Sequence, residues 1–219
     1  MLPVVEALPR AGAVVSIDTR HAAIMAEAVD AGAAIINDVT ALEGDPDSLA
    51  AAAESGVPVI LMHMQGEPQT MQVNPTYDSA ALDIYGYLAR RLEACAAAGI
   101  DPGRVVVDPG IGFGKTVAHN LAPFEARALF QGLGTAVLLG ASRKSFIAKL
   151  HPQAAAPKDR LAGSLAAALF GLQRGVQILR VHDVPETVQA VAVWQAARAV
   201  PPPVDDTSRP AYSIGKALL

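Results

Sequence analysis

The stretch VVVDPGIGFGKT, residues 105 to 116, joins a short apolar run to a glycine-rich turn. A continuous rather than alternating run of valines is typical of a parallel strand that is buried on both faces. The ending Gly-Lys-Thr resembles a nucleotide-binding phosphate loop, which needs four residues between its first glycine and the Gly-Lys pair. Gly110 and Gly114 enclose only three residues, and one position earlier lies Pro109, which has no N–H to offer an anion. The stretch therefore predicts a buried strand and a tight turn, not an ATP or GTP site.

Similar apolar runs recur along the chain and predict further strands. The predicted strands cover residues 13 to 18, 33 to 38, 57 to 64, 104 to 109, 136 to 142 and 176 to 183. Between them lie longer stretches with helical spacing, several of which end in glycine, the usual residue after a helix. An amphipathic segment at residues 2 to 10 predicts a helix that no strand precedes. Because strand and helix alternate without a hairpin signal, the sequence predicts an α/β protein with a mostly parallel sheet.

Polar side chains follow the predicted strands at the points where the strands end. They are Asp18, Asn37, Asp38, His63, Asp108, Ser142, Arg143, Lys144, Arg180, His182 and Asp183. In a β/α barrel the active site lies at the C-terminal mouth, where residues from many strands converge, whereas an open doubly wound sheet concentrates them at one point. The distribution favours a TIM-type (β/α)8 barrel, with only about six of its eight strands present. We expect residues 1 to 200 to form this barrel and residues 201 to 219 to form a proline-rich tail.

The composition limits the classes of partner and site. The 219 residues are 52% hydrophobic and 17% charged, which is enough apolar material for one large domain. A net charge of −4 predicts no binding to nucleic acid or to a membrane surface. The sequence has a single cysteine, Cys95, which excludes an intramolecular disulfide and a cysteine-based zinc site. It has no His-x-His pair after a strand, which argues against a metal-dependent amidohydrolase. Without a leader-like start or an apolar stretch of about 18 residues, we expect a cytoplasmic location.

A set of motifs, taken in chain order, resembles the dihydropteroate synthase family. The motifs are SIDTR, IINDV, LMHMQGEPQTMQ, DPGIGFGKT, GASRKSFI, RLAGSLAAALF and RVHDVPET. The resemblance covers roughly residues 2 to 198 and implies an eight-stranded β/α barrel. The implied reaction belongs to folate biosynthesis and condenses 6-hydroxymethyl-7,8-dihydropterin diphosphate with 4-aminobenzoate, giving 7,8-dihydropteroate and diphosphate. Mg²⁺ as cofactor and a homodimer formed through late helices are also implied.

The resemblance implies a role for each matching residue. The residues implied to bind the pterin are Asp18, Asn37, Met64, Asp108, Lys144 and Arg180. Ser142 and Phe113 are implied to bind 4-aminobenzoate, and Arg180 and His182 are implied to bind diphosphate. Asp108, Lys144 and Arg180 are the implied catalytic residues. A carboxylate can accept both bonds from the amino group and ring N–H of a pterin, and a planar guanidinium can lie on the pterin face. No side-chain nucleophile is needed, because catalysis consists of orientation and electrostatic help for the departing diphosphate.

Several interpretations of the whole chain stay open. The family's first two strands have no counterpart before Leu2, and neither does the loop asparagine that helps to hold Mg²⁺, so no metal ligand is assigned. The chain is then a fragment or misplaced start of a synthase, a non-catalytic pterin-binding or oligomerising remnant, or the pterin domain of a corrinoid-dependent methyltransferase. The motifs SRKS and RVHD argue against the methyltransferase, because they suit 4-aminobenzoate and diphosphate. We expect little or no synthase activity from this chain alone.

Some strand-end residues also have a purely structural interpretation. Asp18 fits an N-cap of the helix that follows it, although we favour the pterin role. His63 fits a hydrogen-bonded core histidine better than a ligand contact. Asp183 and Thr187 fit the capping of the final helix and are not assigned to the site.

Overall fold

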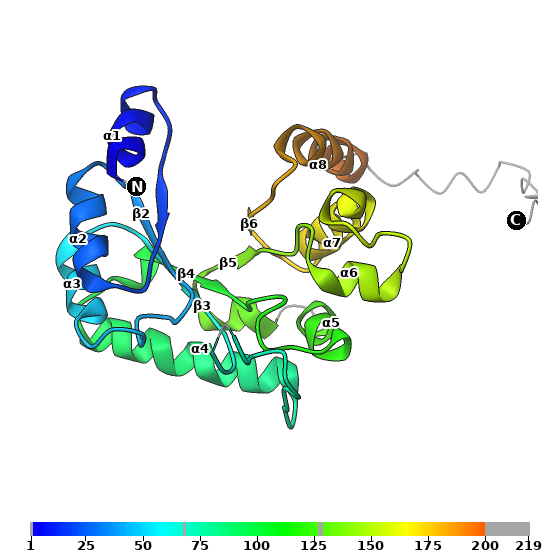
Figure 1. Cartoon of the computed structure of the whole chain (residues 1–219), viewed down its shortest axis with the longest axis horizontal. Helices are drawn as coiled ribbons and strands as arrows, with labels where there is room; N and C mark the ends of the chain where they lie inside the picture. Colours follow the sequence, from blue (N-terminus) through cyan, green and yellow to red (C-terminus); the bar gives the residue numbers. More distant parts are fainter. Residues whose placement is uncertain (1, 68, 127–128, 200–219) are drawn as a thin grey trace, which may run out of the picture.

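The computed structural model describes residues 2 to 67, 69 to 126 and 129 to 199 (Figure 1). Six parallel strands form one sheet in the order β1-β2-β3-β4-β5-β6. They are β1 Ser16–Asp18, β2 Ile35–Asp38, β3 Val59–Met62, β4 Val105–Asp108, β5 Ala136–Leu139 and β6 Ile178–Leu179. Neighbours in the sheet are neighbours in the chain, which is the strand order of a β/α barrel. The prediction of six parallel strands in an α/β fold is confirmed, while the predicted tail at 201 to 219 and the domain boundary at 200 lie outside the described residues.

Helices connect the strands and lie on the outer side of the curled sheet (Figure 1). They are α1 Leu2–Arg10, α2 Ala22–Asp30, α3 Ser48–Ser55, α4 Ala80–Ala97, α5 Val117–Glu125, α6 Ser145–Leu150, α7 Leu161–Gln173 and α8 Val184–Ala199. The sequence pattern did not predict α5 or α6. Helix α5 contains Pro123, which ordinarily breaks a helix, and α6 has only 6 residues, too few for a periodic pattern.

The last strand is shorter than the sequence predicts. The strand itself covers only Ile178–Leu179, and the N–H of Arg180 still donates to the carbonyl of Leu139 in β5 at 3.0 Å, whereas the apolar run suggested a strand from 176 to 183. Arg180, His182 and Asp183 therefore lie in the connection between β6 and α8 and not on the strand itself. From this connection the Arg180 side chain extends across the carboxyl end of the sheet to Asn37 and Asp108.

The main core lies between the sheet and the helices that cover it. One buried cluster joins Met25 of α2 and Cys95 of α4 to Ile36 of β2 and Leu61 of β3. Burying these side chains stabilises the fold by roughly 25 cal/mol for each Å² of apolar surface removed from water. This is the principal stabilising contribution to such a layer. Cys95 is 1% exposed and belongs to this cluster, so it is a small buried residue of the helix.

The curled sheet is open on one side within the described residues. Helices α1 and α8 lie on the two sides of this opening (Figure 1). A groove of about 580 Å³ lies there between β6 and α8, and its lining includes Leu179, Val184, Val188 and Val191. No helix among the described residues is long and apolar enough to cross a membrane.

Candidate active site

The carboxyl ends of the strands meet at one end of the sheet. The register pairs Asp18 of β1 with Asn37 of β2, and Met62 of β3 with Asp108 of β4. The backbone ladder continues beyond the last pair, because the N–H of His63 donates to the carbonyl of Asp108 at 3.0 Å. Residues far apart in the sequence are thereby brought side by side, as the strand-end argument predicted.

A buried polar cluster connects three of these strand ends. Arg180, after β6, donates from Nη1 to Oδ1 of Asn37 at 2.9 Å and from Nη2 to Oδ2 of Asp108 at 2.8 Å. The other carboxylate oxygen of Asp108 accepts the N–H of Gly110 at 2.8 Å. Asp108 is 0% exposed and Asn37 is 2% exposed. The Nδ2 of Asn37 is buried and has no hydrogen-bond partner among the described residues, so this cluster retains a donor for a ligand.

The ionisation of Asp108 depends on its neighbours. Burial raises the pKa of this carboxyl, and the Arg180 guanidinium is the largest influence in the opposite direction. The N–H of Gly110 and the more distant Lys115 and Lys144 also favour the charged form. A ligand that displaces Arg180 must therefore supply its own donors to the Asp108 carboxylate.

A glycine in β5's continuation makes room for Arg180. A Cβ added at Gly140 would lie 2.9 Å from Nη2 and 3.2 Å from Nε of Arg180. A larger residue at this position would push the guanidinium away from Asp108. The sequence GASRK therefore begins with a glycine for a steric reason.

Lys144 and Phe113 form the second part of the site. The Nζ of Lys144 lies 4.0 Å from the centroid of the Phe113 ring, within the range of a cation–π contact. Burial lowers the pKa of Lys144, Arg180 lowers it further, and Asp108 acts in the opposite direction. The half-buried ammonium lies beside an aromatic surface and has hydrogen-bonding capacity for an acceptor on a ligand.

Ser142 is buried against His182 in this structure. Its Oγ accepts the backbone N–H of His182 at 3.2 Å and lies 3.0 Å from the Nδ1 of the same residue. The hydroxyl has one proton, so a hydrogen bond donated to Nδ1 competes with one donated to a substrate carboxylate. The geometry makes Ser142 a support for the exposed His182 ring.

Asp18 was given two interpretations, a pterin contact and the N-cap of the helix that follows it. Helix α2 begins after His21, and its first amide, on Ala22, is bonded to Oδ2 of Asp45 at 3.0 Å. The alternative interpretation of Asp18 as the N-cap is therefore wrong. Asp18 is exposed at the end of β1, beside Asn37, while Met64 is partly buried just after β3.

Three residues that were given structural interpretations have structural contacts. His63 is 6% exposed and bonds through Nδ1 to the Nζ of Lys115 at 2.9 Å, so its interpretation as a core histidine is confirmed. Thr187 donates from Oγ1 to the carbonyl of Asp183 at 2.7 Å, in the first turn of α8. The carboxylate of Asp183 pairs with Arg143, with Oδ2 at 3.0 Å from Nε, and thus fixes the connection before α8.

The loop after β2 is held by the residue next to Asn37. The Oδ1 of Asp38 accepts both the N–H and the hydroxyl of Thr40 at 2.7 Å, and Oδ2 accepts the N–H of Leu42 at 3.0 Å. These bonds support two consecutive residues in the left-handed region, Ala41 at φ 51 and Leu42 at φ 64. Asp38 thus organises its own loop, while its neighbour Asn37 belongs to the site.

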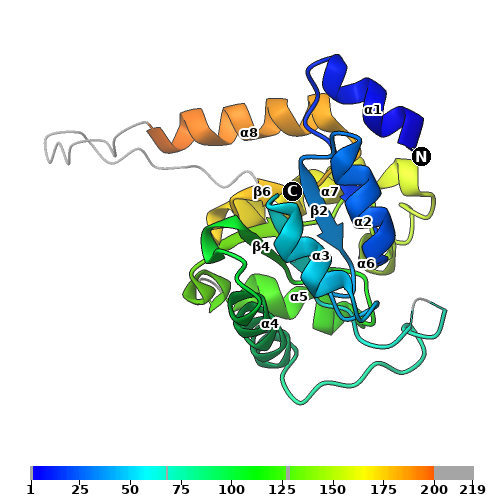
Figure 2. The same ribbon diagram turned by 90° about the vertical axis from the view of Figure 1, so that its left-hand side faces the viewer.

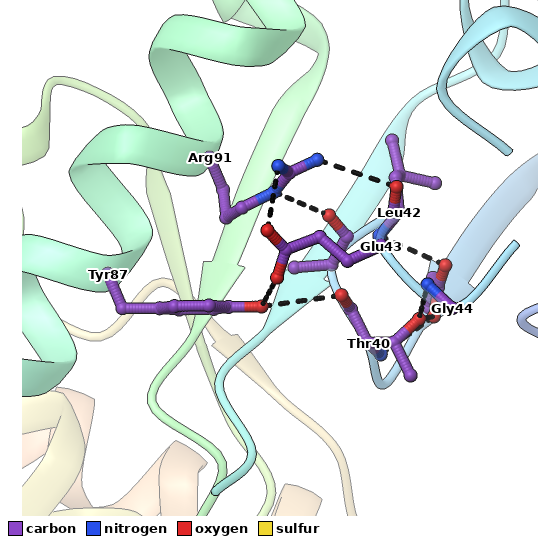
Figure 3. Close-up of polar contacts among 8 residues, drawn as sticks. Thr40, Leu42, Glu43, Gly44, Tyr87 and Arg91 are labelled. Atoms are coloured by element: carbon purple, nitrogen blue, oxygen red, sulfur yellow. Dashed lines mark hydrogen bonds and ion pairs between the residues drawn. The ribbon is translucent and has the colours of Figure 1, made fainter. Parts of the chain in front are cut away.

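Helix α4 fastens the same loop from outside (Figure 3). The Tyr87 hydroxyl donates to Oε2 of Glu43 at 2.8 Å and contacts the carbonyl of Thr40 at 3.3 Å. Arg91 donates to Oε1 of Glu43 at 3.0 Å and to the carbonyl of Ala41 at 2.9 Å. The strand end that carries Asn37 is therefore braced against the helical layer.

Sequence reasoning missed the contribution of Lys115. This lysine is 1% exposed, so its ammonium does not face solvent or a phosphate. The available signal was the lysine of the Gly-Lys-Thr ending, which the failed phosphate-loop spacing left without a role. No group of three or more His, Cys, Asp or Glu side chains placed to hold a metal ion occurs in the part of the chain that the structure describes.

Comparisons with known proteins agree with this arrangement. The family model described as pterin binding enzyme matches residues 1 to 182. A dihydropteroate synthase of Escherichia coli is 43% identical over 197 residues, which are 90% of this chain and 69% of that relative.

Solved structures give the same result. A Xanthomonas albilineans dihydropteroate synthase in complex with 7,8-dihydropteroate matches with a TM-score of 0.85 and 43% identity, covering 92% of this chain and 73% of that one. A structure of the same enzyme with 4-aminobenzoic acid matches with a TM-score of 0.85 and 43% identity, covering 92% and 71%. Motifs, strand order and overall similarity agree, and the chain belongs to the dihydropteroate synthase family of pterin-binding enzymes.

Proposed function

We propose that this chain carries the substrate-binding strand ends of a dihydropteroate synthase, with the substrates bound at the carboxyl ends of the parallel strands. The observation that carries the proposal is the buried Asp108 carboxylate beside Asn37, whose Nδ2 has no partner among the described residues. The E. coli relative and the X. albilineans structures with product and with 4-aminobenzoic acid support the reaction. They favour a synthase over the pterin domain of a methyltransferase.

The pterin takes the place of Arg180 at Asp108. A pterin presents an amino group beside a ring N–H, a donor pair that resembles the edge of the guanidinium now bonded to Asp108 and Asn37. Once displaced, the planar Arg180 side chain lies on the pterin face. The Nδ2 of Asn37 donates to a ring acceptor, and Asp18 supplies a further acceptor from β1.

The second substrate lies beside Phe113. Lys144, whose Nζ already lies over the Phe113 ring, donates to the pterin carbonyl or the neighbouring ring nitrogen. Phe113 lines the path of 4-aminobenzoate, and Met64 gives the pterin an apolar wall. Ser142 is assigned to the 4-aminobenzoate carboxylate, in competition with its bond to His182.

The reaction exchanges one bond for another at the pterin methylene carbon. The carbon–oxygen bond to diphosphate breaks, the amine nitrogen of 4-aminobenzoate bonds to the carbon, and that nitrogen loses one proton. Arg180 and His182 receive the departing diphosphate, so the protein contributes orientation and complementary charge. The family resemblance implies that Mg²⁺ adds charge neutralisation, but the described residues offer no cluster of ligands, so no step is assigned to the metal.

The proposal includes a homodimer in the cytoplasm. An apolar groove of about 360 Å³ among α5, α6 and α7, lined by Phe124, Phe146, Leu150 and Phe170 with their neighbours, supports packing against a second copy. Sedimentation of the purified chain measures this directly. A monomer at all concentrations would remove the dimer from the proposal.

The assignment of Asp108 is tested by calorimetric titration of residues 1 to 219 with a pterin and, separately, with 4-aminobenzoate. Asp108→Ala removes two charge-assisted bonds, so we expect pterin affinity to fall by about 100-fold, while 4-aminobenzoate affinity changes far less. Asp30→Ala, at an exposed position of α2, is the matched control and leaves both affinities unchanged. Equal pterin affinity in Asp108→Ala and the parent chain would rule out the role.

Turnover is a separate measurement. We expect little or no 7,8-dihydropteroate from residues 1 to 219 alone. Pterin binding without product agrees with this expectation, whereas product formed at normal turnover would contradict it. Repeating the assay with Lys144→Met tests the catalytic assignment of that lysine, because the substituted side chain has no N–H donor.

A further inference from the structure

Lys115 has no role in the proposed reaction, yet it is the largest side chain among the fully buried residues that the structure describes. Its Nζ lies 3.0 Å from the carbonyl oxygens of Gly110 and Phe113 and 2.9 Å from Nδ1 of His63. A fourth, longer contact of 3.4 Å reaches the carbonyl of His63. An ammonium has three N–H donors, and these short contacts use all of them.

The bonds of Lys115 join two connections at the end of the sheet. Gly110 and Phe113 belong to the turn between β4 and α5, and His63 begins the long connection between β3 and α4. Buried carbonyls that lose their donors are costly, so the turn depends on a donor in this position. No other residue type of similar volume supplies three donors from an unbranched apolar stem.

The β3–α4 connection completes the support of the same turn. The Gln72 side chain donates to the carbonyl of Gly112 at 2.7 Å, and the Tyr77 hydroxyl donates to the carbonyl of Gly114 at 2.8 Å. With Lys115, side chains therefore bond the carbonyls of Gly110, Gly112, Phe113 and Gly114. In Figure 2 this connection is the long excursion that precedes α4.

The other side of this turn faces the candidate site. Its Gly110 N–H holds the Asp108 carboxylate, and its Phe113 ring lies under the Lys144 ammonium. Gly112 lies so close to Lys144 that an added Cβ would be 3.0 Å from its Cδ. A displacement of the turn therefore moves groups assigned to both substrates.

We propose that Lys115 is a positioning residue, which bonds the β4–α5 turn to the end of β3 and so sets Asp108 and Phe113 for the two substrates. The proposal rests on the proposed function for the identity of the substrates. The position of the turn itself does not depend on it. Lys115 contacts no substrate and acts only through the turn.

The first test substitutes Lys115→Met in residues 1 to 219, which keeps the apolar stem and removes every donor. We expect pterin affinity, measured by calorimetry, to fall by about tenfold or more, because the Asp108 carboxylate loses its fixed position. Hydrogen exchange over residues 106 to 116 rises at the same time, while exchange over residues 13 to 40 changes little.

Two controls separate positioning from a general loss of stability. Lys149→Met makes the same chemical change at an exposed residue of α6 and leaves affinity and exchange unchanged. Met25→Ala removes a fully buried side chain from α2, far along the chain from the turn, and lowers stability without selective exchange over 106 to 116. If pterin affinity falls in proportion to the loss of stability, and to the same extent in Met25→Ala and Lys115→Met, the positioning role is overturned.

Lys115→Gln covers the case in which the methionine variant does not fold. Glutamine keeps two donors on a shorter side chain, so we expect a folded protein with a several-fold loss of pterin affinity and a selective rise in turn exchange. Unchanged affinity and unchanged exchange would overturn the proposal.

The two measurements also separate this proposal from the proposed function. If the parent chain binds no pterin, the proposed function fails, and exchange alone decides the role of Lys115. A selective rise over 106 to 116 supports it, and unchanged exchange overturns it.

Discussion

Two loops at the same end of the sheet are held by buried charges of opposite sign. In the loop after β2, the Asp38 carboxylate accepts two backbone N–H groups and one hydroxyl. In the turn after β4, the Lys115 ammonium donates to backbone carbonyls and to His63. Each charge replaces the hydrogen bonds that a sheet ladder would give to the backbone.

The difference between the two loops lies in what the charge connects. The Asp38 carboxylate bonds only residues within four positions of itself, so this charge acts within its own loop, which Tyr87 and Arg91 of α4 fasten from outside. Lys115 also bonds His63, 52 positions earlier in the chain, so its turn is coupled to another strand. We therefore expect damage to the first loop to lower stability, and damage to the second to reach the site as well.

The largest effect is expected at a glycine of the second loop. In Gly110→Ala the new Cβ would lie 1.9 Å from the backbone oxygen of His63, and the residue would have to keep a φ of 70°. Because the obstacle is backbone, we expect a loss of about 4 kcal/mol in the free energy of unfolding, measured by urea denaturation.

Gly44→Ala is the matched change in the first loop. Its Cβ would meet the Oγ1 of Thr40 at 2.6 Å, a side-chain atom that can move if it gives up its bonds to Asp38 and to the Gly44 N–H. We expect a loss of about 1 kcal/mol. An equal loss in the two alanine variants would contradict the distinction between backbone and side-chain obstacles.

Asp38→Ala is expected to have the next largest effect. The change leaves the buried N–H of Leu42 and the N–H of Thr40 without their acceptor, so we expect a loss of about 3 kcal/mol in the free energy of unfolding. Thermal denaturation followed by circular dichroism measures the loss. Asp47→Ala, at an exposed position whose side chain caps nothing, should cost less than about 0.5 kcal/mol. Similar losses in both variants would show that Asp38 does not organise the loop.

The buried lysine gives the second loop a pH dependence. Burial lowers the pKa of Lys115 to about 7; Asp108 is the largest influence in the opposite direction, and Lys144 lowers the pKa further by a smaller amount. An unfolded lysine has a pKa of about 10.4, so above pH 7 the unfolded chain binds more protons than the folded one. The free energy of unfolding therefore rises with pH above about 7, with a slope of at most about 1.4 kcal/mol per pH unit from this group.

Urea denaturation at pH 7, 8 and 9 measures this slope, and the difference between the parent chain and Lys115→Met isolates the lysine. Asp38→Ala retains Lys115 and should follow the parent profile. A second effect has the same direction in acid: burial lowers the pKa of His63 to about 3, so the free energy of unfolding falls as the pH falls from about 6.5 toward 3. Parallel profiles for the parent and Lys115→Met above pH 7 would contradict the assignment.

The smallest effects are expected for two tyrosine hydroxyls. Tyr87→Phe removes bonds to the first loop, and Tyr77→Phe removes the bond to Gly114 in the second. Each should cost about 1 kcal/mol of stability. Only Tyr77→Phe should also weaken pterin binding, by roughly twofold to threefold in calorimetry, because its loop carries the site. A weaker pterin affinity in Tyr87→Phe alone would reverse the comparison.

The sequence predicted the parts of the molecule that depend on local patterns. Apolar runs and the polar residues that follow them identified the six strands, Asn37 and Asp108, because burial on both faces and convergence of strand ends leave a direct signal. Helix α5 was missed because Pro123 disguises it, and the end of β6 was placed too far along the chain. The role of each site residue in binding substrate stays a prediction.

Contacts between distant residues left no such signal. Arg180 bonds Asn37 across 143 positions and Asp108 across 72, and no spacing rule connects them. The role of Lys115 was missed for a different reason. A lysine is ordinarily exposed, and only the fold reveals that carbonyls surround this one.

The bonds from Arg180 to Asp108 and Asn37 have a consequence for inhibitor discovery. A compound with a guanidine-like edge competes with a tethered side chain that is present at a high effective concentration, so its measured affinity understates its intrinsic fit. Removing the competitor, for example in Arg180→Ala, should make weak fragments easier to detect. Compounds that tolerate Arg180 and stack against it should then gain most when the parent chain is restored.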